Sequence, residues 1–293
     1  MKIVLPATSA NLGPGFDAAG LAMSLYLTVE AEAAPEFSLT ATGRDAERCG
    51  RLERSYIVDT YRDVLLAAGK PVTPLALNLQ NEIPLGMGCG SSASALLAGV
   101  ALADYFGDLR LGDAGIVSEA SRREGHPDNV AACWYGGFTV SALTEAGVQV
   151  ATFAGDPEWR LLLAMQETSL ATHKARALLP ESYSKADAVF NVQRAVLLTA
   201  AFAQGRLDLL ATAMQDRLHQ PYRSEACPLL KALLPLNGTA GIAGAALSGA
   251  GPSVLMVLAA DADEAQVRVK VRELAGDVEL LSLRIAGGMR REL

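Results

Sequence analysis

Three alternating glycines followed by serines give residues 84–94 the clearest potential for binding chemistry. In order, the segment reads Pro84, Leu85, Gly86, Met87, Gly88, Cys89, Gly90, Ser91, Ser92, Ala93 and Ser94. Backbone N–H groups in such a loop can surround an oxyanion, and the positive end of a helix beginning at the serines favours the same anion. A Walker A loop is excluded because no Gly-Lys-Ser/Thr sequence occurs,. The loop predicts phosphate binding; the alternative is a glycine-rich helix entry that only packs closely against a strand.

A second loop, at residues 6–17, contains two prolines and two glycines that force a tight, irregular path after the first strand. Asn11 and Asp17 are short polar side chains that such a loop can direct at a ligand. In the alternative interpretation, both side chains bond their own backbone in ordinary turns. This loop alone does not decide between the two.

Acidic and polar side chains gather again between residues 119 and 129. Glu119 falls within a predicted helix, and Glu124, His126, Asp128 and Asn129 follow it closely. A helical carboxylate is usually part of a solvated face, and a His-Pro-Asp-Asn sequence also suits an Asx turn. Because the segment holds more polar groups than a turn requires, we interpret it as a candidate site.

A second Gly/Ser loop and a few cationic side chains complete the set. The loop spans residues 248–253, and its alternative is an ordinary hairpin turn. Thr172, Arg176 and Arg223 lie in two segments that supply guanidinium groups, which suit carboxylates and phosphates; lone surface arginines are the commoner case. Two Gly/Ser anion loops, a helical acid and the lack of a redox or metal-cage motif predict nucleotide-dependent phosphoryl transfer, with the substrate left open.

The composition is that of a globular protein with a sizeable core. The 293 residues are 51% hydrophobic and 19% charged, with a formal net charge of −7. Acidic chains repel phosphate backbones and anionic lipids, so we expect neither nucleic acid nor a membrane as partner. No apolar run reaches the roughly 18 residues of a spanning helix, and we expect no signal peptide. The four cysteines are widely spaced, which predicts reduced thiols in a cytoplasmic protein,.

The elements that position these segments are mixed without a regular βαβ rhythm, which predicts an α+β fold. Period-two alternation predicts strands at residues 25–32, 37–41 and 75–79, and weaker patterns predict strands at 138–143, 148–153, 160–165, 254–258 and 278–285,. Helices are predicted at 56–68, 91–105, 113–123, 173–178, 185–204, 207–218, 229–234 and 263–274,. A boundary at Gly155-Asp156-Pro157 predicts domains 1–154 and 155–293,.

These segments resemble the motifs of the GHMP kinase superfamily, whose phosphate loop is similar to residues 84–93. Residues 6–17 and 124–131 narrow the resemblance to the homoserine kinase family, and residues 248–253 look like the third motif of the superfamily. Residues 171–180 are also similar. The match runs from about residue 3 to residue 254 with the motifs in order, which makes it far more specific than any one motif.

The resemblance implies a kinase that uses ATP and Mg²⁺ to convert L-homoserine to O-phospho-L-homoserine in threonine biosynthesis. It also implies an N-terminal ATP-binding domain like the second domain of ribosomal protein S5, a ferredoxin-like C-terminal domain, and a homodimer. The alternatives are another small-molecule kinase of the superfamily, which the His-Pro-Asp-Asn cluster disfavours, and a ligand-binding module without activity. The inactive ligand-binding module is disfavoured because the polar residues expected at the site are all present.

Residue roles follow from the resemblance position by position. Residues 84–94 should wrap the ATP phosphates, with the third motif steadying them through Ser248, Gly249, Ala250 and Gly251. Mg²⁺ should be held by Ser92 and Glu119, with Glu124 as the less favoured acid. The homoserine pocket should contain Asn11, Asp17, His126, Asp128 and Asn129, with Arg176 and Arg223 on the carboxylate. The groups expected at the reaction itself are Asp17, Glu119, Asn129 and Thr172. We expect positioning without a dedicated base, Asp17 being the alternative; adenine contacts stay unassigned, and Cys89 stands where the loop more often has an apolar residue.

Overall fold

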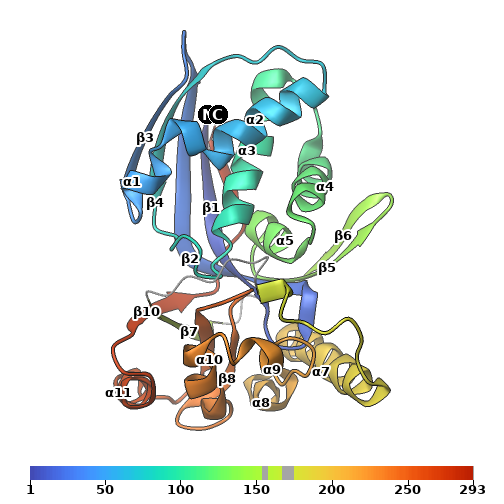
Figure 1. Ribbon diagram of the computed structural model, residues 1–293, viewed down its shortest axis with the longest axis vertical. Helices are drawn as coiled ribbons and strands as arrows, with labels where there is room; N and C mark the ends of the chain where they lie inside the picture. The colour runs from blue at the N-terminus through green and yellow to red at the C-terminus, as the bar shows by residue number, and fades with distance from the viewer. Residues whose placement is uncertain (154–157, 167–174, 293) are drawn as a thin grey trace.

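The computed structural model describes residues 1–153, 158–166 and 175–292, which form two β-sheets that each pack against helices (Figure 1). In the first sheet the strands run in the order β11-β1-β2-β4-β3, and β5 pairs with both β2 and β6. Their bounds are β1 (Lys2–Asn11), β2 (Gly15–Ala33), β3 (Ser38–Gly43), β4 (Leu75–Asn81), β5 (Phe138–Thr144), β6 (Gly147–Thr152) and β11 (Arg290–Glu292). Lys2 and Glu292, near the two ends of the chain, therefore pair with each other in this sheet.

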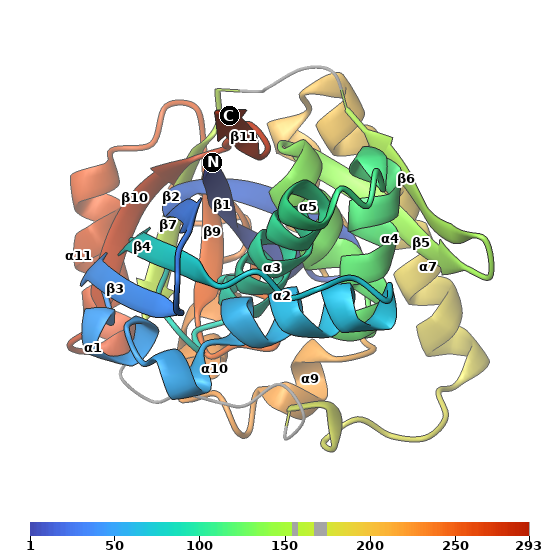
Figure 2. The same cartoon turned by 90° about the horizontal axis from the view of Figure 1, so that it is seen from above.

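Helices cover one face of the first sheet (Figure 2). The longer ones are α2 (Tyr56–Ala67), α3 (Ser91–Gly107), α4 (Gly112–Glu124) and α5 (Asp128–Tyr135), and two short ones are α1 (Ala46–Cys49) and η1 (Leu52–Arg54). Ser55 caps α2 by accepting the N–H of Val58, as its sequence predicts,. In α3, a Cβ at Gly99 would lie 2.6 Å from Thr60 Cβ. Only glycine lets α3 approach α2 this closely, so α3 is buried between the sheet and its neighbours.

The second sheet has the strand order β10-β7-β9-β8. Its strands are β7 (Arg160–Met165), β8 (Ile242–Leu247), β9 (Val254–Leu258) and β10 (Glu279–Arg284). Its helices are α7 (Lys185–Gln204), η2 (Leu207–Leu209), α8 (Leu210–Ala213), α9 (Gln220–Arg223), α10 (Pro228–Leu233), η3 (Leu234–Leu236) and α11 (Glu264–Ala275). In chain order the sheet reads 4-1-3-2 with helices after the first and third strands, which is the ferredoxin-like βαββαβ arrangement. The α+β fold is confirmed.

Most predicted elements are present, and the differences have local causes. The helix predicted at 207–218 is a 3₁₀ turn followed by the short α8, because Asp216 caps the backbone N–H groups of residues 218–220 and starts a new turn there. Helix α5 and strand β8 have no predicted counterpart. The proposed boundary lies outside the described residues, and β11 returns from the predicted second domain to pair with β1. No helix of the described chain is long and apolar enough to cross a membrane.

Candidate active site

Segments far apart in the sequence meet around a cavity of about 150 Å³ between the two sheets. The cavity is lined by Ala10, Asn11, Asp17, Gly86, Gly88, Cys89, Gly90, Ser91, Ser92, Glu124, His126, Asp128, Asn129, Arg176, Arg223, Gly249, Ala250 and Gly251. The structure thus brings the phosphate loop, the loop after β1, the turn before α5, two arginines and the third motif to one place. Thr172 lies outside the described residues.

The glycines of the phosphate loop adopt the conformation that an anion-binding loop needs. Gly86, Gly88 and Gly90 have φ values of 74°, 73° and 71°, and Gly90 is the N-cap of α3. Alternating left-handed residues turn successive N–H groups to one side, next to the positive end of the helix. A Cβ at Gly88 would lie 2.1 Å from Ser248 O, so this position excludes any side chain.

Only the middle of the predicted phosphate segment lines the cavity. Pro84, Leu85 and Met87 line a neighbouring surface depression, while Ala93 and Ser94 are buried inside α3. The thiol of Cys89 is buried, and burial raises its pKa to about 12. It therefore behaves as the apolar residue it replaces.

The third motif contacts the phosphate loop directly. Ser248 Oγ donates to Gly88 O over 2.7 Å and lies 2.9 Å from Ser9 Oγ. The N–H of Gly249 donates to Ala10 O over 3.1 Å. The motif joins the phosphate loop to β1, and each contact spans a large separation in sequence.

The acid beside the phosphate loop is Glu124, which corrects the expectation for Glu119. Ser92 Oγ donates to Glu124 Oε2 over 3.0 Å. The carboxylate of Glu119 instead pairs with Arg122 and Arg123, each over 2.7 Å, and does not line the cavity. Glu119 and Glu124 are five residues apart on α4, so they point about 140° apart around the helix. One helix cannot present both acids to the same site.

The environment of Glu124 suits a bound cation. Burial raises the pKa of its carboxyl, and no ion pair to it is formed within the described chain. Mg²⁺ takes oxygen ligands, and here a carboxylate and the Ser92 hydroxyl stand together at the phosphate loop,. These residues therefore fit the metal that the phosphate loop would need.

A stability measurement tests this description of Glu124. The raised pKa means that the folded protein keeps this proton to higher pH than the unfolded chain, so the carboxyl costs stability as pH rises above about 4.5 and the cost levels off past the folded pKa,. Glu124→Gln without nucleotide should therefore melt above wild type at neutral pH, and the difference in Tm should shrink towards acid. Thermal unfolding of both proteins from about pH 4 to 8 measures it. The control Glu119→Gln loses its arginine pairs and should not rise; a pH-independent difference for Glu124→Gln would contradict the account.

The irregular loop expected at residues 6–17 is only a turn at residues 12–14, because β1 extends to Asn11 and β2 begins at Gly15; Asp17 therefore lies in β2, in a strained conformation. Asn11 and Asp17 have positive φ values of 71° and 55°,. Asn11 Oδ1 accepts the N–H of Asp17 over 3.0 Å, and its Nδ2 donates to Gly249 O over 2.9 Å. Each end of the Asn11 amide thus makes one hydrogen bond within the protein, and Asn11 also lines the cavity as expected.

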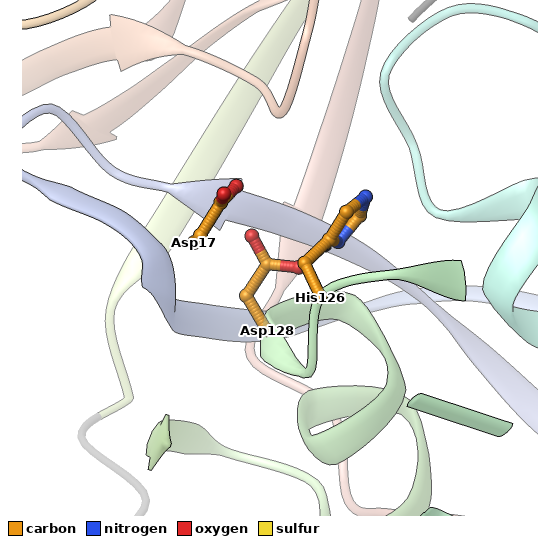
Figure 3. Close-up of side chains that lie close together, drawn as sticks. All are labelled: Asp17, His126 and Asp128. Carbon is orange, nitrogen blue, oxygen red and sulfur yellow. Dashed lines mark hydrogen bonds and ion pairs between the residues drawn. The ribbon is translucent and has the colours of Figure 1, made fainter. Parts of the chain in front are cut away.

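Asp17, His126 and Asp128 form a compact cluster at the cavity (Figure 3). Their nearest polar atoms all lie within 4.8 Å of one another, and His126 Nδ1 is 2.7 Å from Asp128 Oδ1. Asp17 also binds Arg176 through both oxygens, over 2.7 and 3.0 Å. Burial opposes a charge on His126, but the hydrogen bond to Asp128 and the nearby carboxylates raise its pKa overall.

Asn129 is oriented by a residue that the sequence analysis did not single out. Thr8 Oγ1 donates to Asn129 Oδ1 over 2.7 Å, and both side chains are buried. This bond identifies the oxygen end of the amide, leaving Nδ2 with Asp128 Oδ1 at 3.3 Å. Thr8 therefore determines which end of the Asn129 amide is available at the cavity.

Family models and related proteins match this chain over most of its length. The GHMP kinases N terminal domain matches residues 55–137, and the GHMP kinases C terminal domain matches residues 198–276. A homoserine kinase of Solibacter usitatus is 47% identical over 86% of this chain and 83% of its own length, and one of Deinococcus radiodurans is 41% identical over 85% and 81%. The chain belongs to the homoserine kinase family.

Solved structures show the fold of this family and its superfamily. The homoserine kinase from Cytophaga hutchinsonii superposes with a TM-score of 0.81 at 23% identity, covering 99% of this chain and 96% of that one. L. major mevalonate kinase superposes with a TM-score of 0.71 at 17% identity, covering 98% and 97%. The two-domain GHMP kinase fold is therefore confirmed for this chain.

Proposed function

We propose that this member of the homoserine kinase family transfers the γ-phosphoryl group of ATP to the hydroxyl of L-homoserine in the cavity described above. The observation that carries the proposal is that an anion-binding loop and a cluster of opposite charges open into one cavity. The loop suits a polyphosphate, and the charges suit an amino acid, which carries both an ammonium and a carboxylate. Transfer between the two needs both substrates side by side.

The charged cluster supplies partners for each end of the amino acid. Arg176 and Arg223 are the guanidinium groups at the cavity and would bind the substrate carboxylate,. Asp17, His126 and Asp128, with Asn129, would surround the amine and the hydroxyl. Partners of opposite charge at each end offset the cost of taking the two charges of the zwitterion out of water.

Mg²⁺ would be held by Ser92 and Glu124 beside the phosphate loop, and when bound it neutralises phosphate charge during transfer. The backbone N–H groups of residues 86–92 would hold the phosphates, and the third motif keeps that loop in place through Ser248. The chain itself thus supplies position and charge, which account for most of the catalysis of phosphoryl transfer.

In this proposal the described cavity residues supply position and charge rather than a strong base. Both oxygens of Asp17 accept hydrogen bonds from Arg176, so the protein already engages this carboxylate. Because the transition state of phosphoryl transfer is loose, the acceptor hydroxyl does not have to lose its proton early in the reaction. We propose that Asn129 and its neighbours orient the hydroxyl and that no dedicated base acts.

Thr8→Val should reduce kcat roughly tenfold, because the isosteric change removes the donor that fixes the Asn129 amide,. KM for L-homoserine should change much less. Thr8→Ser, which keeps the hydroxyl, should restore most of kcat. Thr139→Val is the matched control, since the Thr139 hydroxyl is buried without a hydrogen-bond partner in the described chain. Equal losses in Thr8→Val and Thr139→Val would refute the role of Thr8.

Acceptors that lack one end of the zwitterion test the recognition of L-homoserine. We expect kcat/KM to fall by at least about a hundredfold for 4-hydroxybutanoate and for 3-aminopropan-1-ol, because each leaves a buried charge without its partner. Steady-state ADP release measures all three acceptors. Comparable kcat/KM for the three would contradict recognition from both ends.

We also propose that the protein is a cytoplasmic homodimer, as the family resemblance implies. Light scattering on the purified protein measures its mass in solution, and a single species at the monomer mass of 30.6 kDa would contradict the dimer.

A further inference from the structure

His219 is a fully buried histidine that stands behind the cavity without lining it. It precedes α9, the short helix that carries Arg223 one turn later. Its Nε2 lies 2.7 Å from Gly13 O, and its Nδ1 lies 3.2 Å from Arg223 Nη1. A carbonyl can only accept and a guanidinium can only donate. The imidazole is therefore neutral, with its proton on Nε2 and its lone pair on Nδ1.

Arg223 is held on three of its donors. Its Nε donates to Ala175 O over 3.3 Å, and its Nη1 serves both Gly249 O and His219 Nδ1, each over 3.2 Å. A guanidinium has five N–H groups in one plane. These bonds use the three on Nε and Nη1, so among the described residues nothing bonds Nη2, which can meet a ligand of the cavity that Arg223 lines. Of the three acceptors that Arg223 contacts, only His219 is a side chain. Its lone pair on Nδ1 therefore favours the orientation of the guanidinium that leaves Nη2 available.

The surroundings of His219 hold the ring in place. Asp216 Oδ2 accepts the backbone N–H groups of His219 and Gln220, and Phe16 stacks on the imidazole with ring centroids 5.3 Å apart. Burial and the charge of Arg223 lower the pKa of His219, while Asp216 opposes that change. Gly13, the partner of Nε2, belongs to the turn between Asn11 and Asp17. One neutral ring thus connects the arginine to the turn that precedes the opposing carboxylate of Asp17.

We propose that His219 is a positioning residue: through Nδ1 it orients Arg223 so that Nη2 meets the substrate carboxylate, and through Nε2 it joins Arg223 to the turn before Asp17. The inference rests on the proposed function, because it assigns the carboxylate of L-homoserine to Arg223. The inference goes beyond that function because it gives His219, which does not touch the substrate, a role in binding the carboxylate end of L-homoserine.

Two substitutions separate the two bonds of the ring. His219→Gln can keep a donor near the Nε2 position for Gly13 but removes the acceptor of Arg223, whereas His219→Asn keeps an acceptor near the Nδ1 position and loses the bond to Gly13. We expect KM for L-homoserine to rise about tenfold or more in His219→Gln and about threefold or less in His219→Asn. KM for ATP should stay within about twofold in both, and kcat should change less than KM for L-homoserine.

The acceptor 3-aminopropan-1-ol, which lacks the carboxylate, distinguishes positioning from a general structural role. His219→Gln should leave kcat/KM for this acceptor close to wild type, because Arg223 has no partner on it. Equal rises in KM for the two variants, or an equal loss with both acceptors, would overturn the proposal. If wild type itself does not prefer L-homoserine, the proposed function fails first; if it does and His219→Gln keeps that preference, only the role of His219 fails.

A measurement on the wild-type protein covers the case in which a variant does not fold. Imidazole ¹⁵N–¹H correlation spectra resolve which ring nitrogen carries the proton. A neutral His219 protonated on Nε2 is the expected result. A proton on Nδ1, alone or in an imidazolium, would remove the acceptor for Arg223 and overturn the proposal.

Discussion

Glu124→Gln should lower kcat about a hundredfold or more and raise the Mg²⁺ concentration needed for half-maximal activity. The carboxylate of Glu124 stands beside the Ser92 hydroxyl at the phosphate loop, and a neutral amide is a weaker ligand for a hard cation. Loss of one charged group that stabilises a transferring phosphoryl group costs several kcal/mol of barrier, and each ~1.4 kcal/mol is tenfold in rate. The measurement is kcat against free Mg²⁺ at saturating substrates.

Glu119→Gln is the matched control for this prediction, because it makes the same chemical change five residues earlier on the same helix. Its carboxylate pairs with Arg122 and Arg123 away from the cavity, so kcat and the Mg²⁺ requirement should stay close to wild type. The reverse result, with Glu119→Gln impaired and Glu124→Gln active, would show that the acid beside Ser92 is not the one that matters.

Arg176→Ala should raise KM for L-homoserine by about thirtyfold, the low end of the roughly 2–5 kcal/mol that truncating one side of a buried charge pair costs, because the side chains of Arg176 and Asp17 are 38% and 33% exposed,. The loss has two sources. The substrate carboxylate loses a guanidinium, and Asp17 loses the partner that neutralises it, so Asp17 then repels that carboxylate. Arg176→Lys should recover only part of the loss, because an ammonium cannot form the two parallel bonds that Arg176 makes to Asp17,.

The control for Arg176 is an arginine whose carboxylate partner is remote from the cavity. Arg206 pairs with Asp208 at the surface, where both side chains are at least half exposed, and such pairs contribute little. Arg206→Ala should leave KM for L-homoserine unchanged. An unchanged KM in Arg176→Ala as well would remove Arg176 from substrate binding. Initial-rate kinetics over a wide range of L-homoserine concentration measure both variants.

Local patterns in the sequence predict the elements whose exposure alternates. The second half of strand β2 (residues 27–33) and helix α2 each bury one face and expose the other, so their periods of two and of 3.6 are visible in the residues,. Helix α5 buries Asp128 to Trp134 on all sides. A helix with no exposed face has no period, and its His-Pro-Asp-Asn start resembles a turn, which is why no helix was expected there.

The candidate site could be predicted as a set of motifs but not as a geometry. The alternating glycines of the phosphate loop are recognisable in the sequence because their positive φ values favour glycine, and at Gly88 the approach of Ser248 also excludes a side chain. The choice between Glu119 and Glu124 depends on which side of α4 faces α3, and that is decided by packing between helices. The pairing of His219 with Gly13 joins residues 206 positions apart, so only the folded chain reveals it.

ADP release from Mg-ATP with one acceptor at a time tests the proposed phosphoryl transfer most directly; the acceptors are L-homoserine, D-homoserine, L-threonine, mevalonate, galactose or none. We predict rapid turnover with L-homoserine alone. Turnover with mevalonate or galactose and not with L-homoserine would keep the fold and the phosphate loop but contradict the assignment of the charged cluster. No turnover with any acceptor, from folded protein that binds ATP, would contradict the proposal that this cavity performs phosphoryl transfer.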